Sequence, residues 1–210
     1  TFAWKGIPYA APPVGDLRFR PPARHACFSG TLQATSFGNL CTQLDEQGNV
    51  VGDEDCLTLN VWAPQAASPS PRPVMVFLPG GGNTAGGSAV QRAGTYLYDA
   101  QPLVEATGSI VVTLNYRLGV LGFFALPALD AESDHKSSGN YGLLDQIAAL
   151  EWVKANIAAF GGDPAKVMLF GESAGALDTC MLMVSPLSTG LFSAALMESG
   201  GCPGPTLLAT

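Results

Sequence analysis

Three short apolar runs constrain the fold of this chain more than any other feature of its sequence. They are "VMVFL" (74–78), "SIVVTLN" (109–115) and "KVMLFG" (166–171). Such nearly continuous runs are typical of strands that are covered on both faces. A fourth segment, "TLNVWAP" (58–64), alternates like a strand, and the proline- and glycine-rich stretch before it predicts short strands and fixed turns.

A long helical pattern lies between the second and third runs. Residues 141–162 carry apolar side chains at helical spacing, and the glycine pair at their end predicts the helix terminus. Asp163-Pro164 predicts the N-cap and first residue of a single turn, and residues 174–185 predict another helix. Strands that alternate with helices predict an α/β fold, with a largely parallel central sheet and helices on both faces.

The composition excludes several kinds of partner. The 210 residues include 10 Lys and Arg against 17 Asp and Glu, a formal net charge of −7, and no basic cluster, so we expect no nucleic acid to bind. No apolar stretch is long enough to span a membrane. The N-terminus lacks a signal pattern, so we expect any leader to have been removed or to lie outside the chain. No Cys or His cluster has metal-ligand spacing, so we expect no metal.

The chain has five cysteines, an odd number, so at least one thiol pairs elsewhere or stays free. Cys41 and Cys56 bracket a polar loop, and a disulfide there would stabilise the fold by about 3 kcal/mol through lost chain entropy. Spacing alone does not decide between that disulfide and two free thiols. Cys180 lies in an apolar helical run, which predicts a buried small hydrophobe, whereas Cys27 and Cys202 are undecided.

The motif "GESAG" (171–175) directly follows the third apolar run and precedes a predicted helix. A tight strand-to-helix turn presents the serine hydroxyl at the edge of the sheet, and the helix N-terminus aims free N–H groups at a developing anion. An ordinary glycine-rich turn is the alternative, because this chain has 25 glycines.

A second glycine motif, "LPGGGN" (78–83), follows the first apolar run. Consecutive glycines let backbone N–H groups approach a ligand, as an oxyanion hole requires. A phosphate cradle would need a GxxxxGK[ST] or GxGxxG pattern, which this segment lacks. A flexible loop is the remaining alternative.

Five blocks of the chain resemble the type-B carboxylesterase/cholinesterase family, in that family's order. They are "GIPYAAPPVGDLRFRPP" (6–22), "EDCLTLNVWAP" (54–64), "VTLNYRLGVLGFF" (112–124), "GNYGLLDQIAALEWVKANIAAFGGDPAKV" (139–167) and "LFGESAG" (169–175). The resemblance implies an α/β-hydrolase fold. It also implies that Ser173 is the nucleophile, that Glu172 supports the catalytic groups, and that three backbone N–H groups form the oxyanion hole, those of Gly81, Gly82 and Ala174.

The resemblance further implies three structural pairings: the disulfide Cys41–Cys56 and the ion pairs Arg18–Glu54 and Arg117–Asp145. A disulfide favours an oxidising compartment, so we expect a secreted or periplasmic protein. Two positions depart from the family pattern, because Pro79 and Asn83 stand where aromatic side chains or histidine are usual. Asn83 would place an amide on the wall of the acyl pocket and favour a polar acyl group. The loop from Cys41 to Cys56 has no aromatic residue to hold a quaternary ammonium, which favours a carboxylesterase over a cholinesterase.

The chain contains no histidine after Ser173, although the order in this fold is serine, acid, histidine. Asp178 and Glu198 follow the serine but do not match the family's acid, and His25 and His135 both precede it. We therefore expect residues 1–210 to be the N-terminal part of a single α/β-hydrolase catalytic domain. The acid and the histidine would lie on a second polypeptide from the same precursor, or on another segment of one protein.

These features predict hydrolysis of a small-molecule carboxylic ester through an acyl-enzyme on Ser173, without a metal or organic cofactor. The alternative is a non-catalytic adhesion or binding protein, because the family includes members that keep the fold and lose the chemistry. The nucleophile position is commonly replaced in those members, so Ser173 favours the enzyme.

Overall fold

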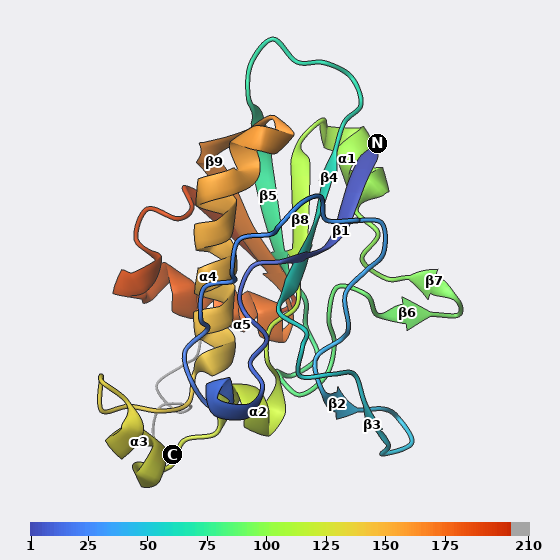
Figure 1. Cartoon of the computed structure of the whole chain (residues 1–210). Helices are drawn as coiled ribbons and strands as arrows, with labels where there is room; N and C mark the ends of the chain where they lie inside the picture. The colour runs from blue at the N-terminus through green and yellow to red at the C-terminus, as the bar shows by residue number, and fades with distance from the viewer. Residues whose placement is uncertain (203–210) are drawn as a thin grey trace.

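A computed structural model, which describes residues 1–202, is built around a six-stranded sheet in the order β1-β4-β8-β5-β9-β10 (Figure 1). The strands are β1 Phe2–Pro8, β4 Thr58–Ala63, β5 Arg72–Leu78, β8 Ile110–Leu114, β9 Gly162–Glu172 and β10 Ala194–Glu198. The β8–β5, β5–β9 and β9–β10 pairs are parallel, whereas β1–β4 and β4–β8 are antiparallel. The predicted α/β fold is confirmed, with the parallel strands β8, β5, β9 and β10 adjacent to one another in a mixed sheet.

Helices cover both faces of this sheet. The helices are α1 Gln101–Thr107, α2 Gly119–Phe123, α3 Pro127–Glu132, α4 Tyr141–Asn156 and α5 Ala174–Val184, with the short 3-10 helices η1 Gly15–Leu17, η2 Ile157–Phe160 and η3 Pro186–Ser188. Side chains alternate between faces along a strand. Val74 and Val76 of β5 accordingly pack into the main core with α4, while Met75 packs with α1 on the other face. Two small hairpins, β2 Gln43–Leu44 with β3 Val50–Val51 and β6 Gln91–Arg92 with β7 Thr95–Tyr96, lie outside the sheet.

Strand β9 begins earlier than its apolar run predicts. Arg72 of β5 pairs with Gly162, and the next paired residues are Val74 and Val167, so β9 is irregular between them. The Asp163 side chain accepts a hydrogen bond from the Ala165 N–H at 2.9 Å within this irregular stretch. The prediction that Asp163-Pro164 starts a helical turn is therefore wrong, because pairing with Arg72 holds the segment in the sheet.

Two disulfides cross-link the described chain. Cys41 pairs with Cys56 around the β2–β3 hairpin, and Cys180 of α5 pairs with Cys202, which follows β10. The prediction for Cys180 is half right, since the residue is only 5% exposed but is oxidised instead of a free thiol. Cys27 is exposed and free.

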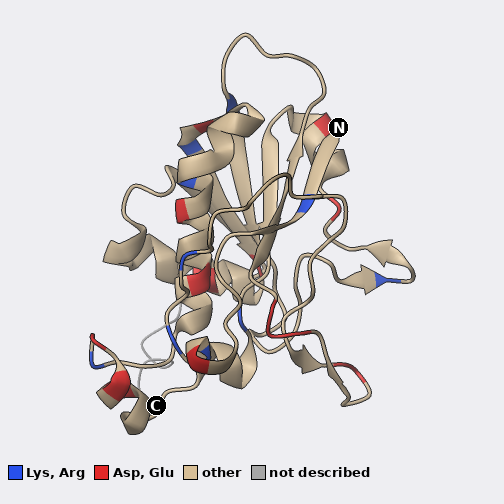
Figure 2. Ribbon diagram, in the orientation of Figure 1, with Lys and Arg blue, Asp and Glu red and all other residues tan. Residues whose placement is uncertain are grey.

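Figure 2 shows charged residues scattered over the helices and loops, with few of them on the strands of the sheet. This distribution matches the absence of a basic cluster in the sequence. Within residues 1–202, no helix is both long enough and apolar enough to cross a membrane.

Candidate active site

Ser173 occupies a strained turn between β9 and α5. Its backbone angles are φ 53° and ψ −117°, a positive φ that residues with a side chain rarely adopt. The Ser173 N–H donates to the Glu198 carbonyl at 2.9 Å, and the Ser173 carbonyl accepts from the N–H groups of Ala176 and Leu177, each at 3.1 Å. The turn is thus fixed from both β10 and α5, while the serine itself stays exposed.

The glycines that flank this turn permit close backbone contacts. A Cβ at Gly171 would overlap the Gly175 carbonyl, and a Cβ at Gly175 would overlap the Leu78 carbonyl. The first turn of α5 therefore packs directly against the end of β5, where the second glycine motif begins.

The loop after β5 passes beside Ser173. A Cβ at Gly80 would lie 2.6 Å from the Glu172 Oε2 and 3.0 Å from the Ser173 Cβ, so only glycine fits there. Gly81 follows with φ 120°, and its carbonyl accepts from the N–H groups of Thr84 and Ala85 at 3.1 and 3.0 Å. The fold thereby brings together the two glycine motifs that the sequence singles out.

The backbone N–H groups of Gly81, Gly82 and Ala174, near this turn, have no acceptor among residues 1–202. Gly81 and Gly82 are exposed on the loop, and Ala174 is the first residue of α5. Unpaired donors at a helix N-terminus and on an adjacent glycine loop are suited to binding an anionic oxygen.

Asn83, the residue after these glycines, has its side-chain amide engaged at both ends. Its Nδ2 donates to the Asp178 Oδ1 at 2.9 Å, and its Oδ1 accepts from the Tyr116 hydroxyl at 2.9 Å. This arrangement corrects the expectation that Asn83 offers a free amide to an acyl group. A phenylalanine side chain at this position could make neither bond, because it has no polar atom.

A profile of the carboxylesterase family matches residues 2–209. The chain belongs to the carboxylesterase family. Over 204 residues it is 48% identical to a fumonisin B1 esterase of Sphingopyxis macrogoltabida, covering 95% of this chain and 37% of that protein. It is 45% identical to a para-nitrobenzyl esterase of Bacillus subtilis, covering 94% of this chain and 40% of that protein.

Solved structures of the family share the fold of this chain. A PNB esterase structure superimposes with a TM-score of 0.83 at 46% identity, covering 95% of this chain and 40% of that one. A Geobacillus stearothermophilus carboxylesterase gives a TM-score of 0.84 at 43% identity, with the same two coverages of 95% and 40%. The α/β-hydrolase fold is therefore confirmed over a partial region, and the chain spans well under half the length of these relatives.

The two predicted ion pairs differ in their surroundings. Arg117 and Asp145 are 4% and 0% exposed, and the guanidinium binds both carboxylate oxygens, at 2.8 Å through Nε and 2.7 Å through Nη2. Burial raises the pKa of the Asp145 carboxyl, and the Arg117 contacts oppose that shift. Arg18 and Glu54 form a similar two-bond contact at the surface, with side chains 44% and 24% exposed.

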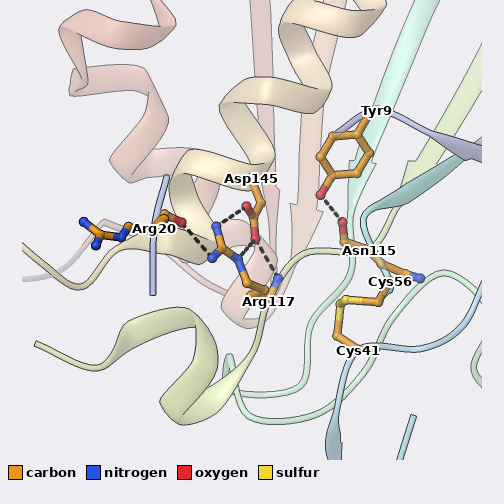
Figure 3. Close-up of polar contacts among 7 residues, drawn as sticks. All are labelled: Tyr9, Arg20, Cys41, Cys56, Asn115, Arg117 and Asp145. Atoms are coloured by element: carbon orange, nitrogen blue, oxygen red, sulfur yellow. Dashed lines mark hydrogen bonds and ion pairs between the residues drawn. A yellow bond between two sulfur atoms is a disulfide. The ribbon is translucent and has the colours of Figure 1, made fainter. Parts of the chain in front are cut away.

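Figure 3 shows how the buried pair is tied to its surroundings. Arg117 Nη1 donates to the Arg20 carbonyl at 2.8 Å, and the Tyr9 hydroxyl donates to the Asn115 carbonyl at 2.6 Å. These contacts and the neighbouring Cys41–Cys56 disulfide form a framework beneath the loops. The Arg117 side chain is therefore not free to hold a substrate in this arrangement.

Of the remaining candidate residues, some lie near Ser173 and others lie far from it. Glu172 is half-buried beside Gly80, and burial and the nearby Glu172 charge together raise the pKa of Tyr98. Glu198 reaches Ser173 only through its backbone carbonyl. His25 stacks on Phe28, and His135 lies in the exposed loop after α3; among residues 1–202, no hydrogen bond joins either imidazole to Ser173.

Sequence reasoning did not find the polar network around Asp178. Asp178 is 1% exposed, and its Oδ2 accepts from the Gln146 Nε2 at 2.6 Å. Burial raises the pKa of the Asp178 carboxyl, while hydrogen bonds from Asn83 and Gln146 act in the opposite direction. The one available signal was an aspartate on the helix after the serine, at a position where the neighbouring pattern is apolar.

Proposed function

We propose that this chain carries the nucleophile and the oxyanion-binding donors of a serine carboxylic-ester hydrolase. The observation that carries the proposal is the group of three unpaired N–H donors beside the strained Ser173 turn. Membership of the carboxylesterase family supports the same chemistry.

In this mechanism, the Ser173 hydroxyl oxygen attacks the ester carbonyl carbon, and the carbonyl oxygen becomes an oxyanion. The N–H groups of Gly81, Gly82 and Ala174 donate to that oxyanion, and each contributes about 3–4 kcal/mol to transition-state stability. A histidine takes the serine proton and gives it to the leaving alcohol. Water then attacks the acyl-enzyme by the same route and regenerates Ser173. None of these steps requires a metal or organic cofactor.

The histidine and the acid are proposed to come from a segment beyond residues 1–210, either on the same polypeptide or on a second one. Residues 1–210 would then be the N-terminal part of a single catalytic domain. The longer relatives support this division. The edge of the sheet supports it too, because within the described residues β10 pairs only with β9, and Leu196 on β10 is 44% exposed.

The proposed substrate is a small carboxylic ester without a quaternary ammonium group. Two relatives are named as esterases for fumonisin B1 and para-nitrobenzyl compounds, which supports an ester substrate for this chain. The Cys41–Cys56 loop carries no aromatic side chain that would hold a choline group. The disulfides Cys41–Cys56 and Cys180–Cys202 favour an oxidising compartment, so we propose secretion or a periplasmic location.

The test is fluorophosphonate labelling followed by intact mass under denaturing conditions, with the Ser173→Ala variant as control. We expect one adduct on the wild-type chain and none on the variant, when the segment that bears the histidine is present. A folded wild-type sample that takes up no label would overturn the proposal and favour a non-catalytic binding protein.

A further inference from the structure

A side-chain contact joins the glycine loop to the helix that follows Ser173. Asn83 comes directly after Gly82, and its Nδ2 donates to the Asp178 Oδ1 at 2.9 Å. Asp178 lies one helical turn beyond Ala174 on α5, and residues at that spacing share a helix face. The contact therefore connects the two backbone segments that carry the unpaired N–H groups.

Both partners in this contact are held by other elements. Asp178 also accepts from Gln146 of α4, whose side chain is 0% exposed. The Tyr116 hydroxyl, which follows β8, shares its proton between the Asn83 Oδ1 and the Pro79 carbonyl, each at 2.9 Å. Tyr116 thus connects Pro79 to Asn83, the first and last residues of the glycine loop (residues 79–83).

Burying the Asp178 carboxylate costs free energy of folding, and a residue that only fills space would not need to be charged. Among the described residues, Asp178 has no ion-pair partner, and a buried carboxylate without one costs several kcal/mol unless its hydrogen bonds compensate. An apolar side chain would fill the same space on α5 without that cost. The hydrogen bonds that compensate come from Asn83 on the loop and Gln146 on α4.

We propose that Asp178 is a positioning residue, which acts through Asn83 to fix the distance between the loop N–H groups and the N–H group of Ala174. The inference rests on the proposed function, because that distance matters only when an oxyanion forms beside Ser173. Donors displaced by a fraction of an ångström lose most of their effect on the transition state, whereas substrate binding in the ground state changes little.

The test exchanges the two side chains. Asn83→Asp places two carboxylates in contact, which repel each other. Adding Asp178→Asn restores a contact between one amide, now at position 178, and one carboxylate, now at position 83. With p-nitrophenyl acetate, and with the histidine-bearing segment present, we expect Asn83→Asp to lower kcat about 10- to 100-fold with KM nearly unchanged. We expect the double variant to recover most of kcat. Asn156→Asp, which makes the same charge change at an exposed position on α4, serves as the control.

Hydrogen exchange at the amides of Thr84 and Ala85, which donate to the Gly81 carbonyl, gives a second reading that does not depend on turnover. Exchange should become faster in Asn83→Asp and slower again in the double variant, while the amides of the sheet strands stay protected from exchange. Unchanged kcat and exchange in Asn83→Asp, or loss of kcat that the double variant does not recover, would overturn the proposal. If wild type takes up no fluorophosphonate, the esterase assignment fails, and the exchange experiment alone decides whether Asp178 orders the loop.

Discussion

Gly175, in the first turn of α5, lies so close to the carbonyl of Leu78 at the end of β5 that a single methyl group would not fit between them. This contact sets how near the helix N-terminus approaches the glycine loop. It is a backbone contact, so no change of side-chain rotamer can relieve it.

Gly175→Ala should therefore displace α5 from β5. We expect a loss of stability of about 1–3 kcal/mol from overpacking, and a larger loss of fluorophosphonate labelling, because the Ala174 N–H moves with the helix. Chemical denaturation and labelling rate measure the two effects. The control is Gly201→Ala, since a Cβ at Gly201 meets nothing within 4 Å. Normal labelling of Gly175→Ala would show that the contact does not position the helix.

Arg117→Ala should be far more destabilising than Arg18→Ala. Removing Arg117 leaves the Asp145 carboxylate buried and unpaired, which costs about 3–5 kcal/mol. Arg18 and Glu54 lie at the surface, with side chains 44% and 24% exposed, so the loss of their contact should change stability much less. Urea denaturation of both variants measures the difference, and equal losses would contradict this ranking.

The Cys180–Cys202 disulfide should stabilise the protein even though Cys202 lies beyond the last strand. It closes a sequence separation of 22 residues, for which the lost chain entropy corresponds to about 3 kcal/mol. Thermal denaturation of the variant with Cys180→Ala and Cys202→Ala should show that loss. Cys27→Ser, at the free and exposed thiol, should leave the melting temperature unchanged.

The buried Asp178 carboxyl should make stability depend on pH. Burial raises its pKa in the folded protein, so the folded state holds this proton over a pH range in which the unfolded state has released it. The contribution of Asp178 to the free energy of unfolding therefore falls as the pH rises from the ordinary aspartate range through the raised pKa. Asp178→Asn lacks this component. Subtracting its urea-denaturation profile from that of wild type isolates the effect, and a difference that rises with pH would contradict it.

The sheet and the Ser173 turn could be predicted from the sequence because their signals are local. Each apolar run corresponds to a strand, and the glycines around Ser173 mark a turn that only small residues allow. The start of β9 could not be predicted, because it depends on the pairing of Gly162 with Arg72 on another strand. The Cys180–Cys202 disulfide likewise depends on where the chain turns after β10.

The network at Asp178 could not be predicted for a similar reason. Asn83 and Asp178 are 95 residues apart in sequence, and nothing near either residue indicates the other. The sequence around Asn83 predicted an amide on the wall of the acyl pocket. In the fold, that amide instead bonds to Asp178 on α5 and to Tyr116. Local patterns thus singled out the turn at Ser173, while the contacts that hold its surroundings emerge only from the tertiary structure.

The hydrogen bond from the Ser173 N–H to the Glu198 carbonyl has a consequence for synthesis on the ribosome. The serine turn cannot reach its final geometry until β10 has emerged and paired with β9, because its partner is the last residue of that strand. Domains generally begin to fold from the N-terminal side while the chain is still being made. A nascent chain that stops before Glu198 would therefore hold Ser173 without the bond that fixes its turn, and the turn would reach its final geometry only after β10 has been made.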